Sequence, residues 1–175
     1  MTILAIILAG STTVLLQVQR QYTVQRGDAQ ARETVRSLEL VLGRLFRAAR
    51  ADPTGTAGAN VAMVVGPSGP PFRNVEIRSD SYEIDGTVNQ ETENVRVHLV
   101  ADTVFIRWRK GTGPGQPFAY PVNELRFQFY DLSGTTELTT AAAAAGARRV
   151  KVTIGVPVPK SSDVITREIW FALRN

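Results

Sequence analysis

The sequence of 175 residues contains no cysteine and a single histidine, His98. Without cysteine the chain cannot form a disulfide framework or a thiolate metal site. A Ser-His-Asp arrangement would depend on His98 alone, which lies between Val97 and Leu99 in an alternating segment typical of a solvent-facing strand position. The acidic residues match no calcium-loop spacing, and the glycines match no phosphate-binding loop. The sequence therefore predicts a protein that is not an enzyme and has no cofactor and no metal site.

The chain also has only a small excess of charge of one sign. Its 20 Lys and Arg residues stand against 16 Asp and Glu residues, which gives a formal net charge of +4. Much of the basic excess comes from arginines spread between Arg20 and Arg50, not from a dense cluster. The charge distribution by itself does not favour a nucleic acid as the partner.

Charged residues are missing altogether from Ile3 to Val18. A membrane-spanning helix needs about 20 apolar residues, so this run is slightly short of that length. No basic residue precedes the run, and apolar residues continue beyond the small residues Ala9 and Gly10, which disfavours a cleaved signal peptide. We expect a retained apolar helix that packs in a membrane or against other subunits through Ile3, Leu4, Ile6, Ile7, Leu8, Val14, Leu15 and Leu16.

Proline is absent between this run and Pro53, so the helix is expected to continue until Asp52 and Pro53 end it. About 48 helical residues would extend roughly 70 Å, so half of the helix must lie outside its own small domain. Gly27 is expected to be a weak point in an exposed part of the helix. A narrow apolar stripe in the second half is predicted to pack on a sheet through Val35, Leu38, Leu42, Leu45 and Phe46.

After Pro53 the hydrophobic period changes from 3.6 to 2, which predicts strands. Asp85-Gly86 in "SYEIDGTV" and Ala101-Asp102 in "VRVHLVADTVFIRWR" predict hairpins, the second with Trp108 on its buried face. "LRFQFYDLSG", "VKVTIGV" and "VITREIWFALRN" predict further strands, and the alanine-rich segment after Thr140 predicts a loop with a turn of helix. The fold class is α+β, with a long N-terminal helix packed on a small, mainly antiparallel sheet. The expected divisions are an anchor (1–20), an amphipathic half of the helix (21–52) and a globular domain (53–175).

In this order of elements the chain resembles the type IV pilin and pseudopilin superfamily. "MTILAIILAG" is similar to the later half of that superfamily's N-terminal helix. "VRSLELVLGRLFRAARADP", "VRVHLVADTVFIRWRKG", "VNELRFQFYDLSG", "RRVKVTIGV" and the final "IWFALRN" resemble the branch of minor pilins that contains PilW-type pilins and the J-type pseudopilin of type II secretion.

The resemblance implies a pilin-like fold and a non-catalytic structural subunit. Such a subunit waits in the inner membrane with its domain in the periplasm, and then joins the initiating or tip complex of a type IV pilus or a type II secretion pseudopilus. Its implied partners are other minor and major pilin-like subunits, the inner membrane and the inner-membrane assembly platform.

The superfamily's leader motif, a glycine followed by Phe-Thr-Leu-x-Glu, is absent from this sequence. By alignment of the apolar run it would lie about ten residues before Met1 if the helix spans a bilayer with ~20 residues. We therefore expect that the chain is N-terminally incomplete. An in-frame stop codon close upstream, with no leader motif, would contradict this expectation.

The alternative function is a membrane-anchored periplasmic or surface module that binds a ligand or DNA. Its binding residues would be Arg107, Trp108, Arg109 and Lys110, because an aromatic ring between basic side chains can stack on a base.

Overall fold

A computed structural model describes residues 2–49, 63–65, 72–79, 94–108 and 115–173, with the side chains of residues 10–49, 72–79, 94–108 and 115–173. Its first element, α1 (Thr2–Ala48), is one uninterrupted α-helix of 47 residues. The expected Asp85-Gly86 hairpin lies outside the described residues. The helix ends at Ala48 and not at residue 52, so it stops short of Pro53, whose ring disfavours helical geometry in the residue before it.

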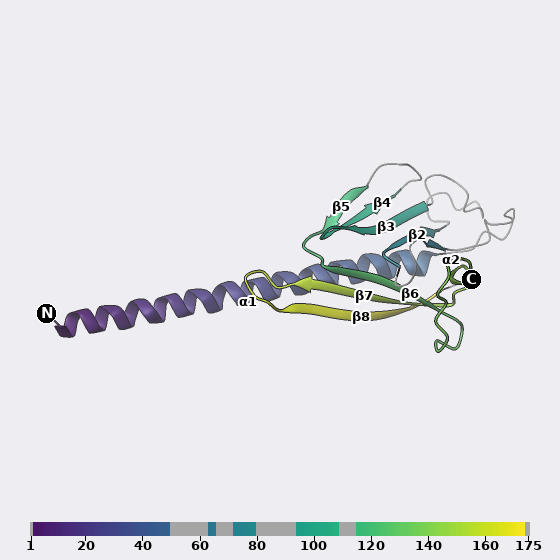
Figure 1. Cartoon of the computed structure of the whole chain (residues 1–175). Helices are drawn as coiled ribbons and strands as arrows, with labels where there is room; N and C mark the ends of the chain where they lie inside the picture. Colours follow the sequence, from purple (N-terminus) through teal and green to yellow (C-terminus); the bar gives the residue numbers. More distant parts are fainter. Residues whose placement is uncertain (1, 50–62, 66–71, 80–93, 109–114, 174–175) are drawn as a thin grey trace.

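Half of α1 lies beyond the rest of the molecule (Figure 1). Residues 10–26 are exposed except for the half-buried Thr23, and burial begins at Gly27. We call residues 10–26 the projecting segment. At about 1.5 Å per residue, the helix from Thr2 to Arg26 extends roughly 35 Å from the domain. The expectation that half of the helix lies outside the domain therefore agrees with the structure.

The strands form two antiparallel sheets instead of the single sheet expected, so the coarse α+β class is confirmed and the sheet count is corrected. The five-stranded sheet has the order β1-β2-β3-β4-β5, and the three-stranded sheet has the order β6-β7-β8. The strands are β1 (Met63–Val65), β2 (Asn74–Arg78), β3 (Asn94–Val100), β4 (Thr103–Arg107), β5 (Gln116–Ala119), β6 (Glu124–Tyr130), β7 (Arg149–Pro157) and β8 (Val164–Ala172).

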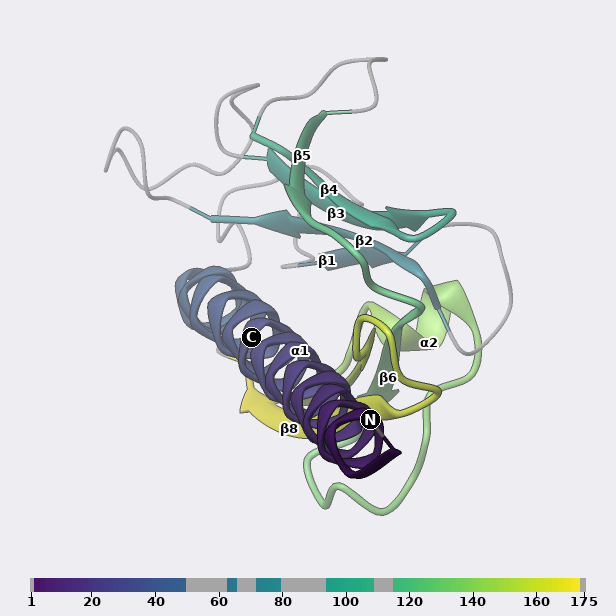
Figure 2. The same cartoon turned by 90° about the vertical axis from the view of Figure 1, so that its left-hand side faces the viewer.

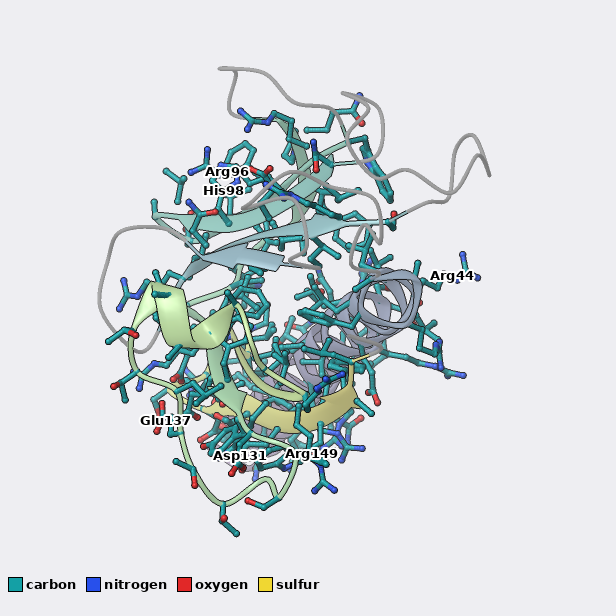
Figure 3. All side chains as sticks on the ribbon, turned by 90° about the vertical axis from the view of Figure 1, so that its right-hand side faces the viewer. Arg44, Arg96, His98, Asp131, Glu137 and Arg149 are labelled. Atoms are coloured by element: carbon teal, nitrogen blue, oxygen red, sulfur yellow. The ribbon has the colours of Figure 1, made fainter. Side chains whose placement is uncertain are left out.

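The buried half of α1 lies between the two sheets (Figure 2) and contacts β7, β8 and β2. Phe46 is fully buried there, with its ring stacked on Phe171 at 5.1 Å and edge-on to Phe127 at 6.1 Å. One side of the helix stays open to solvent, where Arg44 points away from both sheets (Figure 3). The stripe predicted from the sequence, Val35, Leu38, Leu42, Leu45 and Phe46, is buried along its whole length.

The β3–β4 hairpin turns at Ala101-Asp102, as the sequence predicts. Val97 pairs with Ile106, and both side chains are buried beneath the sheet. Trp108 does not join them, contrary to the prediction, since β4 ends at Arg107 and the indole is 51% exposed. Buried and less buried side chains alternate along β4 through Ile106. The strand ends at Arg107, so this alternation does not determine the direction of the Trp108 side chain.

The three-stranded sheet follows its sequence pattern closely. Leu125, Phe127 and Phe129 of β6 are fully buried and pair with alternate buried residues of β7. The alanine-rich segment between these strands forms only α2 (Ala141–Ala144), a single turn whose first amide groups need a cap. Thr140 supplies it: its hydroxyl oxygen accepts a 3.1 Å hydrogen bond from the Ala143 amide. This agrees with the expectation of a loop with a turn of helix.

Gly27 is not the weak point expected from the sequence. It is buried, and the β7–β8 turn lies directly on it: a Cβ at Gly27 would stand 2.8 Å from the carbonyl oxygen of Pro159. The glycine permits the turn to approach the helix backbone closely. Gly27 is the first buried residue of α1 in the described part of the chain, so packing of the domain on the helix begins there. Gly10, in the projecting segment, would meet nothing within 4 Å.

Gly27→Ala should therefore destabilise the domain, by about 1–3 kcal/mol, because the new methyl group meets backbone that cannot rotate aside. Gly10→Ala is the matched control: it adds the same methyl group to the same helix in open space and should be neutral or stabilise the helix by up to about 1 kcal/mol. Chemical denaturation of both variants measures the difference. Equal stability of the two variants would contradict the close contact between Gly27 and Pro159.

Candidate interaction surfaces

The projecting segment is the most apolar exposed surface that the structure describes. Its large side chains lie open to solvent: Val14 and Leu15 are each 60% exposed, and Leu16 is 58% exposed. At 100° per residue these three consecutive side chains point in different directions around the helix axis. These apolar side chains therefore cover roughly 200° of the helix circumference, and Thr13 and Gln17 lie on the remaining side.

Three of the packing residues predicted from the sequence, Val14, Leu15 and Leu16, are therefore exposed as the prediction requires. The other five lie on α1, but their side chains are outside the described residues: Ile3, Leu4, Ile6, Ile7 and Leu8. Val18, at 55% exposed, and Tyr22, at 66%, extend the same surface toward the domain and were missed by sequence reasoning. Among the described residues, no helix combines the length and apolar character required to cross a membrane.

A second exposed surface is the outer face of the five-stranded sheet, where Arg96 and His98 lie side by side on β3 (Figure 3). The His98 ring stacks on Phe105 of β4 at 5.6 Å, so it is half-buried and not simply solvent-facing as expected. Burial lowers the pKa of His98, and the positive charges of Arg96 and Arg107 lower that pKa further. The imidazole is therefore neutral at neutral pH, and its ring packs against Phe105 of the neighbouring strand.

Trp108 continues this surface beyond the end of β4. Its half-exposed indole borders a shallow groove with Arg107 and Gln116. The two basic residues that the alternative function also requires, Arg109 and Lys110, lie outside the described residues. The structure thus brings an exposed aromatic ring beside one arginine.

The outer face of the three-stranded sheet is polar and largely self-neutralised. Lys151 of β7 forms a 2.8 Å ion pair with Glu168 of β8, and the hydrogen bond to Glu168 raises the pKa of Lys151. Gln128 donates a 3.2 Å hydrogen bond to Glu137, which lies at the lower edge of the molecule (Figure 3). Paired surface charges such as Lys151 and Glu168 contribute little to stability.

Within the parts of the chain that are described, no group of three His, Cys, Asp or Glu side chains is placed to hold a metal ion.

Comparisons with known proteins leave this geometry as the main guide to function. No protein-family model matches the chain, and no curated protein matches it.

Proposed function

We propose that this chain is a minor pilin or pseudopilin: a non-catalytic structural subunit that takes part in the initiation or tip assembly of a type IV pilus or a type II secretion pseudopilus. The observation that carries the proposal is the single helix with two environments. Its second half lies between two sheets from Gly27 onward, and its first half projects with the exposed apolar side chains of Val14, Leu15, Leu16 and Val18.

An exposed apolar helix of this kind is unfavourable in water, at about 25 cal/mol for each Å² of apolar surface that is left hydrated. Lipid or a bundle of similar helices removes that surface from water. Apolar groups alone give little attraction between helices inside a bilayer, where close packing of small residues matters more. Gly10 would allow such close approach, since its surroundings in the isolated chain are empty. Membrane storage followed by helix–helix packing in a filament fits both properties.

The domain supports this role by holding the helix at a defined angle and length. The close contact between Gly27 and Pro159 and the stacked rings of Phe46 and Phe171 hold α1 at both ends of its buried half. A filament subunit needs such a rigid connection. With a hinge between helix and domain, the domains of neighbouring subunits would not take the same orientation along the filament. The pilin-like arrangement, the inner-membrane location and the pilin-like partners are all parts of this proposal.

The absence of cysteine makes a direct test possible, because one introduced cysteine is unique in the chain. Leu16→Cys, on the projecting segment, should form oxidative cross-links to other pilin-like subunits in the source cells, identified by mass spectrometry. Thr135→Cys, an exposed position on a loop of the domain, is the matched control and should cross-link far less. Leu16→Cys chains that remain uncross-linked, or cross-link to no pilin-like protein, would contradict the proposal.

A second candidate function is a membrane-anchored binding module for a ligand or DNA, and the exposed indole of Trp108 beside Arg107 is the observation that favours it. Its test is the salt dependence of DNA binding by residues 26–175. Binding that weakens steeply with salt and is lost in Trp108→Ala would favour this function over filament assembly.

A further inference from the structure

The outer edge of β8 differs from the other sheet edges in the described part of the chain. In the five-stranded sheet, β1 is only three residues long, and β5 is four residues long and contains Pro117. In the three-stranded sheet, β6 is bridged on its far side by Phe72 and Glu137. Short strands, proline and a covering segment are the usual protections against unwanted pairing of sheet edges. These three edges are therefore protected.

Within the described residues, the β8 edge is not short, contains no proline and has no segment paired to its outer side; its one inward-facing charge is Arg167. The strand is nine residues long, contains no proline and pairs with β7 in an unbroken register from Val164 to Ala172. Among the described segments, only β7 pairs with it. Val164 is 44% exposed and Trp170 is 50% exposed, so the strand is open to solvent at both ends. An edge of this length presents a row of backbone donors and acceptors to another chain.

A groove of about 430 Å³ runs beside this edge, between β8 and α1. Val35 and Ile165 supply its apolar lining. Three arginines, Arg32, Arg36 and Arg167, and one carboxylate, that of Glu39, supply its charge.

Positive charge predominates in this groove. Arg32 is already engaged, through a 2.8 Å ion pair with Asp28. Neither Arg36 nor Arg167 forms an ion pair with another described side chain. Arg167 stands between the apolar residues Ile165 and Ile169 along β8, and it lines this groove.

A second copy of this chain is a poor match for the edge. In a two-fold antiparallel pairing of all nine residues, the axis passes through Glu168, so Glu168 stands directly opposite Glu168 of the other copy. Like charges directly opposite each other on neighbouring strands are destabilising. The Glu168 carboxylate is, moreover, already paired with Lys151. Among the described side chains of the groove, the charges without an ion-pair partner include Arg36 and Arg167.

We propose that the β8 edge is a strand-addition site for an extended acidic segment of a different polypeptide. The added strand would take up the backbone hydrogen bonds along β8, and its inward-facing residues would lie over the groove. Glutamate carboxylates at these positions would meet Arg36 and Arg167, and the methylene groups of the same side chains would cover Val35 and Ile165. Backbone pairing provides affinity and the charged groove selects the sequence. This surface is separate from the projecting segment, so it does not depend on the proposed function.

The experiment uses the full chain in mild detergent and a synthetic peptide in which valine and threonine alternate with glutamate. Amide hydrogen exchange should slow along β8 when the peptide binds, with no change along β1 or β5. The same peptide with lysine in place of glutamate should give no protection. In the double variant Arg36→Glu/Arg167→Glu, affinity for the glutamate peptide should fall about tenfold, because two opposite-charge contacts become like-charge contacts.

The matched control is Arg26→Glu, an exposed charge reversal on the same helix but in the projecting segment, and it should bind the glutamate peptide normally. Equal binding of the glutamate and lysine peptides would overturn the proposal, as would unchanged exchange along β8. Self-association of the chain that is abolished by the double variant would assign the edge to a second copy instead and would also overturn it.

Discussion

Phe46→Ala should destabilise the domain by about 3–5 kcal/mol, the range for truncating a fully buried phenylalanine. Phe46 has no exposed surface. Its ring contacts Phe127 on β6 and Phe171 on β8, so it packs α1 against two strands of the three-stranded sheet. Alanine would leave a cavity between the helix and the sheet that neither strand can fill, since the register of β6, β7 and β8 is continuous. Chemical denaturation, monitored by circular dichroism, measures the loss.

Leu40→Ala provides the matched control for this prediction. Leu40 lies on the same helix, less than two turns away, but is 54% exposed on the side that neither sheet covers. Its truncation removes few contacts, so the free energy of unfolding should change by about 0.5 kcal/mol or less. If the two variants lost similar stability, the stripe would not be the surface by which α1 packs.

Val14→Arg should release the chain from membranes, as should Leu8→Arg on the same run. The translocon-based cost of arginine near the centre of a membrane helix is about 2.5–3.5 kcal/mol, which corresponds to roughly a hundredfold shift toward the soluble fraction. Val14 is 60% exposed and lies in the projecting segment, so the folded domain should keep its stability. Fractionation of cell membranes, with thermal unfolding of the purified chain, separates the two effects.

Leu40→Arg is the control for added charge, because its exposed site lies on the domain half of the same helix. This variant should stay with the membrane fraction. If the Val14→Arg chain also fractionated with membranes, the projecting segment would not be the anchor, and the proposed membrane stage of assembly would be wrong.

Sequence periodicity was a reliable guide where a pattern depends on near neighbours. The stripe at Val35, Leu38 and Leu42 is visible because residues three or four apart share a helix face. The alternation at Phe127 and Phe129 is visible because successive strand residues face opposite sides. The short strands β1, β2 and β5 were missed, since three to five residues carry too little pattern to recognise.

The candidate sites were predicted less completely. The exposed apolar residues Val14, Leu15 and Leu16 could be chosen from composition, because they lie in the run without charge; that other helices or lipid cover them stays a prediction. Val18 ends the recognised run but was not named as a packing residue, and Tyr22 was missed because it stands among polar residues; no described strand covers either side chain. The β8 edge could not be inferred at all, since an alternating sequence does not show whether a strand has one neighbour or two.

The sequence by itself determined the local order: an unbroken helix with an apolar first half, a striped second half, and strands that alternate. Tertiary structure alone decided where the domain begins to hold the helix, that the strands divide into two sheets, and which edge stays open. The reason is distance along the chain. Gly27 meets Pro159 and Phe46 meets Phe171 only after the chain has folded back on itself, and no local period records those contacts.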